Sequence, residues 1–136
     1  MMQKRMTGLS IGLLFLAGAV FVLHDVATEY FFYWRFWWYD IMMHFLGGAV
    51  VGGLAAWLVI RLMPHISTRR LLGIVLSAVI VVGVGWEVFE YIVGIYANEQ
   101  STIGDTTLDI IMDTVGAFCA YAAISGLVAQ VNTHSS

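Results

Sequence analysis

Three short motifs place ionisable side chains inside otherwise apolar stretches of the sequence. They read "DIMMHF" (residues 40–45), "EVFE" (87–90) and "DIIMD" (109–113). Residues three or four apart lie on one face of an α-helix, so each motif presents its two polar side chains on the same face. Ionisable groups within membrane helices are costly and are usually functional. The three motifs therefore define a candidate functional site.

The polar side chains of the three motifs are expected to lie at matching depths. A helix rises about 1.5 Å per residue, so His44 and Asp109 lie roughly 6 Å from the nearer ends of their helices. On the same scale Glu90 lies roughly 9 Å inward, and Asp113 and Glu87 lie roughly 12 Å and 13 Å inward. Three helices can therefore bring these side chains together.

The cluster has the ligand chemistry of a divalent metal site. Carboxylates that share a poorly hydrated site cannot all stay ionised unaided, so they take up protons or bind a cation. One histidine with several Asp and Glu residues suits zinc, manganese or iron. We expect the metal ligands to be Asp40, His44, Glu90 and Asp109. We expect Glu87 and Asp113 to be catalytic, as a general base or by orienting a ligand. Six such residues would also suffice for two ions.

Structural roles remain open for some of the same residues. Asp40 and Asp105 stand where two helices are expected to begin, and Asp is a preferred N-cap residue. His44 alone could be a hydrogen-bonded histidine of a helix bundle. A role in capping would not exclude a second role in binding.

The elements that must position these residues are four apolar segments, at about 8–24, 40–63, 71–96 and 105–131. Each approaches or exceeds the roughly 20 residues that a helix needs to cross a membrane. Only 11% of the 136 residues are charged, against about 25% in soluble domains. The sequence predicts an all-α membrane protein, with four transmembrane helices in one domain over residues 1–136. We expect the first helix to be retained, because no small-x-small cleavage site follows it.

Basic and acidic residues are sorted between the two ends of the predicted helices. Five of the six basic residues flank the start of the first helix or the loop between the second and third. The positive-inside rule makes that side cytoplasmic, so both chain ends are predicted to be inside. The nine acidic residues all belong to the opposite half: Asp25, Glu29, Asp40, Glu87, Glu90, Glu99, Asp105, Asp109 and Asp113. The candidate site is therefore expected to face outward.

Two further patterns have mainly structural interpretations. The aromatic run "YFFYWRFWWYD" (residues 30–40) is typical of a membrane interface, as a belt or as a lid over the neighbouring site. Glycines four residues apart permit close helix packing, and Gly116 is expected to do the same. These pairs are Gly8 with Gly12 and Gly48 with Gly52.

Several classes of function find no support in the sequence. It has no basic stripe, no P-loop and no nucleophile elbow, which argues against a nucleic-acid partner, a nucleotide site and a serine hydrolase. The single cysteine, Cys119, excludes a disulfide framework within one chain.

Taken in order, the motifs "DIMMHF", "EVFE" and "DIIMDTVGA" resemble those of the VanZ-like and YjdF-like small bacterial membrane proteins. The resemblance covers roughly residues 40–120. It departs at Ile41, where Lys is common, and at Asp113, where the VanZ-like pattern often has Asn. It implies a multi-pass protein of the bacterial inner membrane, linked to the cell envelope, with a polar site facing outward.

These observations favour a metal-dependent hydrolase or transferase that acts on lipid-linked or envelope esters or phosphoesters, with membrane lipid as a partner. A cation- or proton-linked transport or binding module is the alternative. It would need polar side chains to continue inward past Glu87, where the helices carry few. A structural membrane subunit and a homo-oligomer remain open as well.

Overall fold

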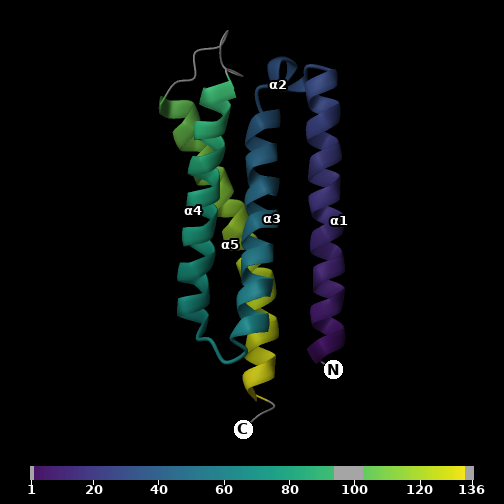
Figure 1. The fold of residues 1–136 in the computed structure, drawn as a ribbon, viewed down its shortest axis with the longest axis vertical. Helices are drawn as coiled ribbons and strands as arrows, with labels where there is room; N and C mark the ends of the chain where they lie inside the picture. The colour runs from purple at the N-terminus through teal and green to yellow at the C-terminus, as the bar shows by residue number, and fades with distance from the viewer. Residues whose placement is uncertain (1, 94–102, 134–136) are drawn as a thin grey trace.

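The computed structural model describes residues 2–93 and 103–133, and every regular element within them is a helix (Figure 1). The elements are α1 (Met2–Glu29), α2 (Phe32–Arg35), α3 (Tyr39–Leu62), α4 (Thr68–Val93) and α5 (Ile103–Thr133). The predicted all-α class is confirmed. The helix α1 begins earlier and ends later than the predicted 8–24. Glu99 and the last residues of the third predicted segment lie outside the described residues.

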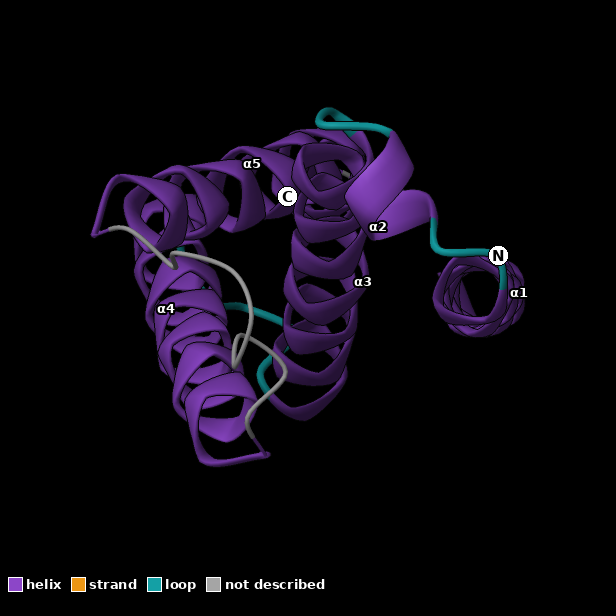
Figure 2. Cartoon of the chain, turned by 90° about the horizontal axis from the view of Figure 1, so that it is seen from above, coloured by secondary structure: helices purple, strands orange, loops and turns teal. Residues whose placement is uncertain are grey.

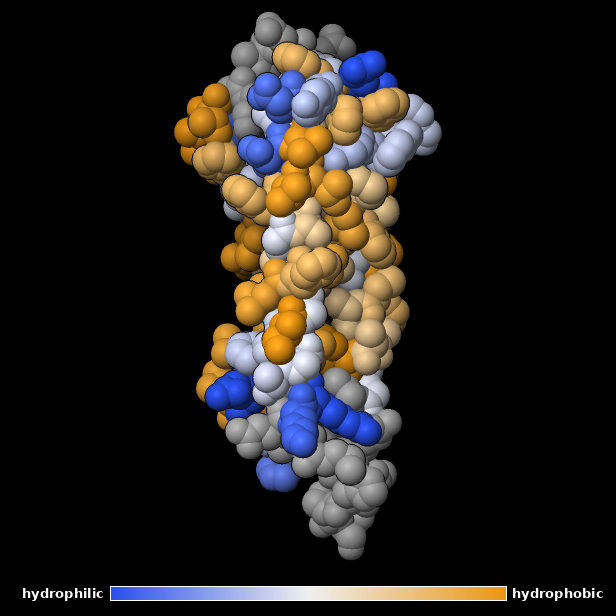
Figure 3. All heavy atoms as spheres, turned by 90° about the vertical axis from the view of Figure 1, so that its right-hand side faces the viewer, coloured by the Kyte–Doolittle hydropathy of each residue, from blue (hydrophilic) through white to orange (hydrophobic). Residues whose placement is uncertain are grey.

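Four of the helices are long and apolar enough to cross a membrane. The shortest of these spans, Gly104–Gly126, has 23 residues, which corresponds to about 35 Å of helix against about 30 Å of hydrocarbon. Figure 3 shows an apolar band across the middle of one face, with hydrophilic residues gathered towards its two ends. The predicted number of transmembrane helices is therefore confirmed.

Helices α3, α4 and α5 form the packed part of the molecule, and α1 stands beside α3 (Figure 2). The buried core of the three-helix part is made of small and branched apolar side chains, including Leu71, Val75 and Val79 of α4 and Ala117 of α5. Among the described residues, the buried polar or charged side chains are His44, Asp109 and Asp113, and all three lie outside this core. The polar cluster is thus confined to one end of the bundle.

Glycines allow α3 and α5 to approach each other closely. A Cβ atom added at Gly48 would overlap the backbone of Asp113, and one added at Gly52 would lie 2.7 Å from Cα of Ala117. A Cβ atom at Gly116 would overlap the carbonyl of Phe45 in the same way. The close packing predicted for these glycines is confirmed, and it brings the acidic face of α5 against α3.

The prediction for the first glycine pair is wrong within the described chain. A Cβ atom at Gly8 or Gly12 would meet no atom within 4 Å, because this part of α1 has no helix packed against that face. Residue spacing shows that two glycines share a face, but it does not show what that face meets.

The start of α1, the end of α5 and the α3–α4 connection lie at one end of the molecule, and α2 lies at the other (Figure 1). The basic residues Lys4, Arg61 and Arg70 belong to the first of these ends. Which end faces the cytoplasm stays a prediction of the positive-inside rule.

Candidate metal centre

The centre of the site is the buried side chain of His44 on α3. Its Nε2 atom lies 3.7 Å from Oδ1 of Asp40, one helical turn earlier, and 3.9 Å from Oδ1 of Asp109 on α5. The imidazole is 8% exposed and the Asp109 side chain 2% exposed. Two carboxylates thus converge on one buried ring nitrogen, and the Asp40 side chain, which is 33% exposed, leaves the group open on one side.

Asp40, His44 and Asp109 form a group that could hold a metal ion, with one ligand atom from each lying within 4.8 Å of the others. Two atoms that each lie about 2.1 Å from a common ion are about 3.4 Å apart in tetrahedral geometry and at most about 4.2 Å apart. The distances from Nε2 of His44 fall between these two values. The donor set and its spacing therefore fit a divalent ion with only a small inward movement.

The other ring nitrogen of His44 faces a third aspartate. Its Nδ1 atom lies 3.5 Å from Oδ2 of Asp113, which is one turn beyond Asp109 on α5. A Cβ atom at Gly83 would lie 2.7 Å from the same Oδ2, so the missing side chain on α4 leaves room for this carboxylate. A histidine that binds a metal usually donates its second N–H to such a group. Asp113 is therefore placed to orient His44.

Glu87 takes part in the cluster from α4 but not through His44. Its Oε2 atom accepts a hydrogen bond of 2.8 Å from the hydroxyl of Thr106 on α5. Its Oε1 atom is buried and has no hydrogen-bond partner among the described residues, and the same holds for Oδ2 of Asp109. The structure thus places Glu87 at the α4–α5 contact.

A cleft of about 330 Å³ adjoins the metal group. The helices α1, α3 and α4 contribute most of its walls, including the apolar residues Val20, Phe21, Val51, Val79 and Val82. Six polar side chains also line it: His24, Tyr33, Asp40, His44, Glu90 and Asp113. The predicted ligand Glu90 therefore faces the cleft, beside the three-residue metal group.

Two of the cleft residues, His24 and Tyr33, were not among the predicted site residues. Nδ1 of His24 lies 2.8 Å from the phenol oxygen of Tyr33, and the His24 ring contacts the edge of Trp86 on α4. Tyr33 sits within the aromatic run, where every ring fits a membrane interface. A left-handed turn at Phe31, with φ of 59°, leads into the short α2 that carries Tyr33, whose ring lines the cleft.

The phenol of Tyr33 is a weaker acid than an ordinary tyrosine. Burial raises the pKa of Tyr33 well above its ordinary value, and the charges of Asp40 and Glu90 raise it further. The phenol therefore stays protonated and can donate a hydrogen bond over the whole physiological range of pH.

The capping role considered for Asp40 is wrong. Helix α3 begins at Tyr39 with Trp38 at the cap position, and no side chain caps it. Asp40 lies inside the first turn, with its carboxylate towards His44. Asp105 likewise lies within the first turn of α5.

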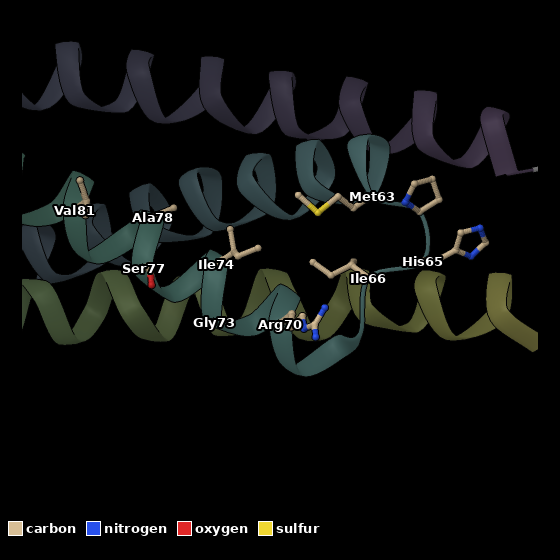
Figure 4. A pocket seen from close by; sticks show the side chains of 10 residues that line it. Met63, His65, Ile66, Arg70, Gly73, Ile74, Ser77, Ala78 and Val81 are labelled. Atoms are coloured by element: carbon tan, nitrogen blue, oxygen red, sulfur yellow. The ribbon is translucent and has the colours of Figure 1, made fainter.

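A second hollow, of about 920 Å³, lies along α4 beside the α3–α4 connection (Figure 4). Its polar lining comes from His65, Arg70 and Ser77, and the rest is mostly apolar. Without a carboxylate in its lining it offers no comparable set of metal ligands. The described side chains that could bind a metal as a group lie at the other end of the bundle.

Comparison with curated proteins gave no match, and comparison with solved structures gave none either. A family model described as "Predicted membrane protein (DUF2238)" matches residues 1–130, which is nearly the whole chain. The match agrees with the four apolar helices and with a multi-pass membrane protein. The chain belongs to the DUF2238 family of membrane proteins.

Proposed function

We propose that the protein is a metal-dependent membrane hydrolase or transferase that acts on an ester or phosphoester of a lipid-linked molecule. One observation carries the proposal: a His/Asp group with the spacing of metal ligands opens onto a cleft that is mostly apolar but also carries His24, Tyr33 and Glu90. A bound divalent ion would polarise the ester oxygen and activate a water molecule at neutral pH.

Each residue of the metal group has a defined task in this proposal. Asp40, His44 and Asp109 hold the ion, and Asp113 keeps the imidazole of His44 turned towards it. Glu90 lies on the cleft wall, where it can act as an additional ligand or as the base. Zinc, manganese and iron all suit this combination of one nitrogen with carboxylate oxygens.

The cleft supports a lipid-linked substrate. Ligand sites of about 300–1,000 Å³ usually combine apolar walls with a few polar groups that fix orientation, and this cleft has both. The apolar residues come from membrane-spanning helices, so a hydrocarbon chain can lie against Val20, Phe21 and Val82. The ester then lies near Asp40 and His44. His24 and Tyr33 stand on the same cleft as hydrogen-bonding groups for its oxygens.

The apolar core favours a site over a pathway through the membrane. Beyond the cleft the buried residues of α4 are Val75 and Leu71, neither of which can carry a proton or bind a cation. We also place the protein in the bacterial inner membrane with the site facing outward, on the strength of the sorted charges and of the resemblance to VanZ-like and YjdF-like proteins.

The test is hydrolysis by the purified protein in mild detergent supplied with Mn²⁺ or Zn²⁺. Suitable probes are dioctanoyl phosphatidic acid, dioctanoyl phosphatidylglycerol and dioctanoylglycerol, which present a phosphomonoester, a phosphodiester and carboxylic esters. We expect metal-dependent release of product from at least one probe, lost in His44→Gln and retained in His65→Gln. His65 is an exposed histidine of the α3–α4 connection, outside the cleft. Equal rates for wild type and His44→Gln would contradict the proposal, as would the absence of any metal-dependent turnover.

A further inference from the structure

Two buried carboxylate oxygens at the site have no hydrogen-bond partner among the described residues, Oδ2 of Asp109 and Oε1 of Glu87. Asp109 is the more deeply buried of the two side chains, since only 2% of it is exposed. Buried polar atoms almost always have a partner, and an unpaired buried charge is especially costly. Within the described residues, a proton or a cation would satisfy these two oxygens.

The remaining oxygens of the same two carboxylates are already engaged. Oδ1 of Asp109 faces Nε2 of His44 at 3.9 Å and belongs to the metal group. Oε2 of Glu87 accepts a hydrogen bond of 2.8 Å from the hydroxyl of Thr106, which fixes the carboxylate in the contact between α4 and α5. Thr106 and Asp109 are three residues apart on α5, so this hydrogen bond brings Glu87 to the face of α5 that carries Asp109. The unpaired oxygens thus lie beside the metal group on neighbouring helices.

The negative charge of the acidic cluster also favours a second cation. Asp40, Asp109, Asp113 and Glu87 bring four negative charges when ionised, and a histidine that binds a metal is neutral. One divalent ion therefore leaves two of the four charges uncompensated. In a membrane-spanning region the protein screens such charges poorly, so a second divalent ion would stabilise the cluster.

We propose that Glu87 and Asp109 hold a second divalent ion beside the first, with one carboxylate oxygen of Asp109 binding each ion. The inference rests on the proposed function, because the first ion occupies the Asp40, His44 and Asp109 group. The oxygen ligands of the second site suit Mn²⁺ or Mg²⁺. Paired ions about 3.5–4 Å apart are typical of enzymes that displace phosphoesters. A second ion would therefore favour lipid phosphoesters over carboxylic esters as substrates.

The experiment counts ions in the purified full-length protein. Wild type, Glu87→Gln and Glu29→Gln are stripped with a chelator, dialysed against MnCl₂ and analysed for manganese per chain, with electron paramagnetic resonance to detect coupled ion pairs. Glu29 is an exposed acid at the end of α1, so its replacement removes one charge away from the cleft. We expect about two ions per chain in wild type and Glu29→Gln, about one in Glu87→Gln, and coupling only in the first two.

The outcomes separate this inference from the proposed function. About one uncoupled ion in both wild type and Glu87→Gln would overturn the second site and leave the first intact. No bound manganese in any of the three proteins would contradict both. Circular dichroism checks that Glu87→Gln is helical; if it is not, the wild-type resonance spectrum decides, since a coupled pair supports the second site and isolated ions overturn it.

Discussion

The Nδ1 atom of His44 lies 3.5 Å from Oδ2 of Asp113, while Nε2 of the same ring faces Asp40 and Asp109. The imidazole is therefore held between carboxylates on both sides. The contact with Asp113 turns Nε2 of His44 towards Asp40 and Asp109, the two other ligands of the metal group.

Replacing Asp113 should weaken metal binding without removing the ligands. A carboxylate that orients a metal-binding histidine is usually worth about 10–100-fold in metal affinity. We expect this loss in Asp113→Ala and a smaller one in Asp113→Asn, whose side-chain oxygen can still face Nδ1 of His44. Competition with a chelator measures the dissociation constant, with Glu29→Gln as the control. Equal affinities in wild type and Asp113→Ala would show that Asp113 does not position His44.

Adding a methyl group at Gly48 should separate α3 from α5. The new Cβ atom would overlap the backbone of Asp113, and overpacking of this kind costs about 1–3 kcal/mol of stability. Thermal unfolding in detergent should therefore show a lower midpoint for Gly48→Ala. Gly73→Ala is the matched control, because a Cβ atom there meets nothing within 4 Å and alanine favours the helix by about 0.5–1 kcal/mol. A Gly48→Ala protein as stable as Gly73→Ala would argue against the close α3–α5 contact.

The stability of the protein should fall at alkaline pH through Tyr33. Burial raises the pKa of Tyr33 in the folded protein above the 10.0 of an unfolded tyrosine. As the pH rises past 10.0, the unfolded chain releases this proton while the native state retains it, so the free energy of unfolding decreases. Below pH 10.0 both states keep the proton, so the contribution of Tyr33 to the free energy of unfolding does not change with pH.

We therefore expect wild type to lose about 1 kcal/mol more stability than Tyr33→Phe between about pH 9 and about pH 11. Denaturant unfolding at several pH values measures the difference. Tyr30→Phe serves as the control, since Tyr30 is an exposed tyrosine of the same aromatic segment and should behave as wild type. Parallel curves for wild type and Tyr33→Phe would show that this phenol is not buried against the site.

Residues at opposite ends of the bundle can establish its orientation. Trp37 follows α2 and is 83% exposed, and His65 lies in the α3–α4 connection at the other end. In a Cys119→Ser background, a membrane-impermeant maleimide added to intact cells should label Trp37→Cys and not His65→Cys. The opposite labelling pattern would reverse the predicted topology and place the metal group on the cytoplasmic side.

The fold was predictable because its main signal is the length and position of apolar runs. The meeting of His44 with Asp109 and Asp113 was also predictable, since helical rise and spacing place them at comparable depths on facing helices. Depth does not give the rotation of a helix about its axis. Residues three apart still differ in direction by about 60°, which is enough to place Glu87 against Thr106 and Glu90 on the cleft.

The contribution of α1 and α2 was not predictable from spacing. His24 and Tyr33 meet across the end of α1 and a turn in which Phe31 has a positive φ. No periodic pattern encodes such a turn. In an aromatic run, the rings that turn inward, Tyr33 and Tyr39, have the same sequence signal as their exposed neighbours.

The most direct test of the metal centre is to measure the metal content of the protein purified in mild detergent without a chelator. The variants His44→Gln and His65→Gln are purified and measured in the same way. If Asp40, His44 and Asp109 hold an ion, wild type and His65→Gln should carry about one or more zinc, manganese or iron ions per chain, and His44→Gln should carry far less. Metal-free wild-type protein, even after incubation with these ions, would contradict the metal centre. Equal metal in all three proteins would contradict the role of His44.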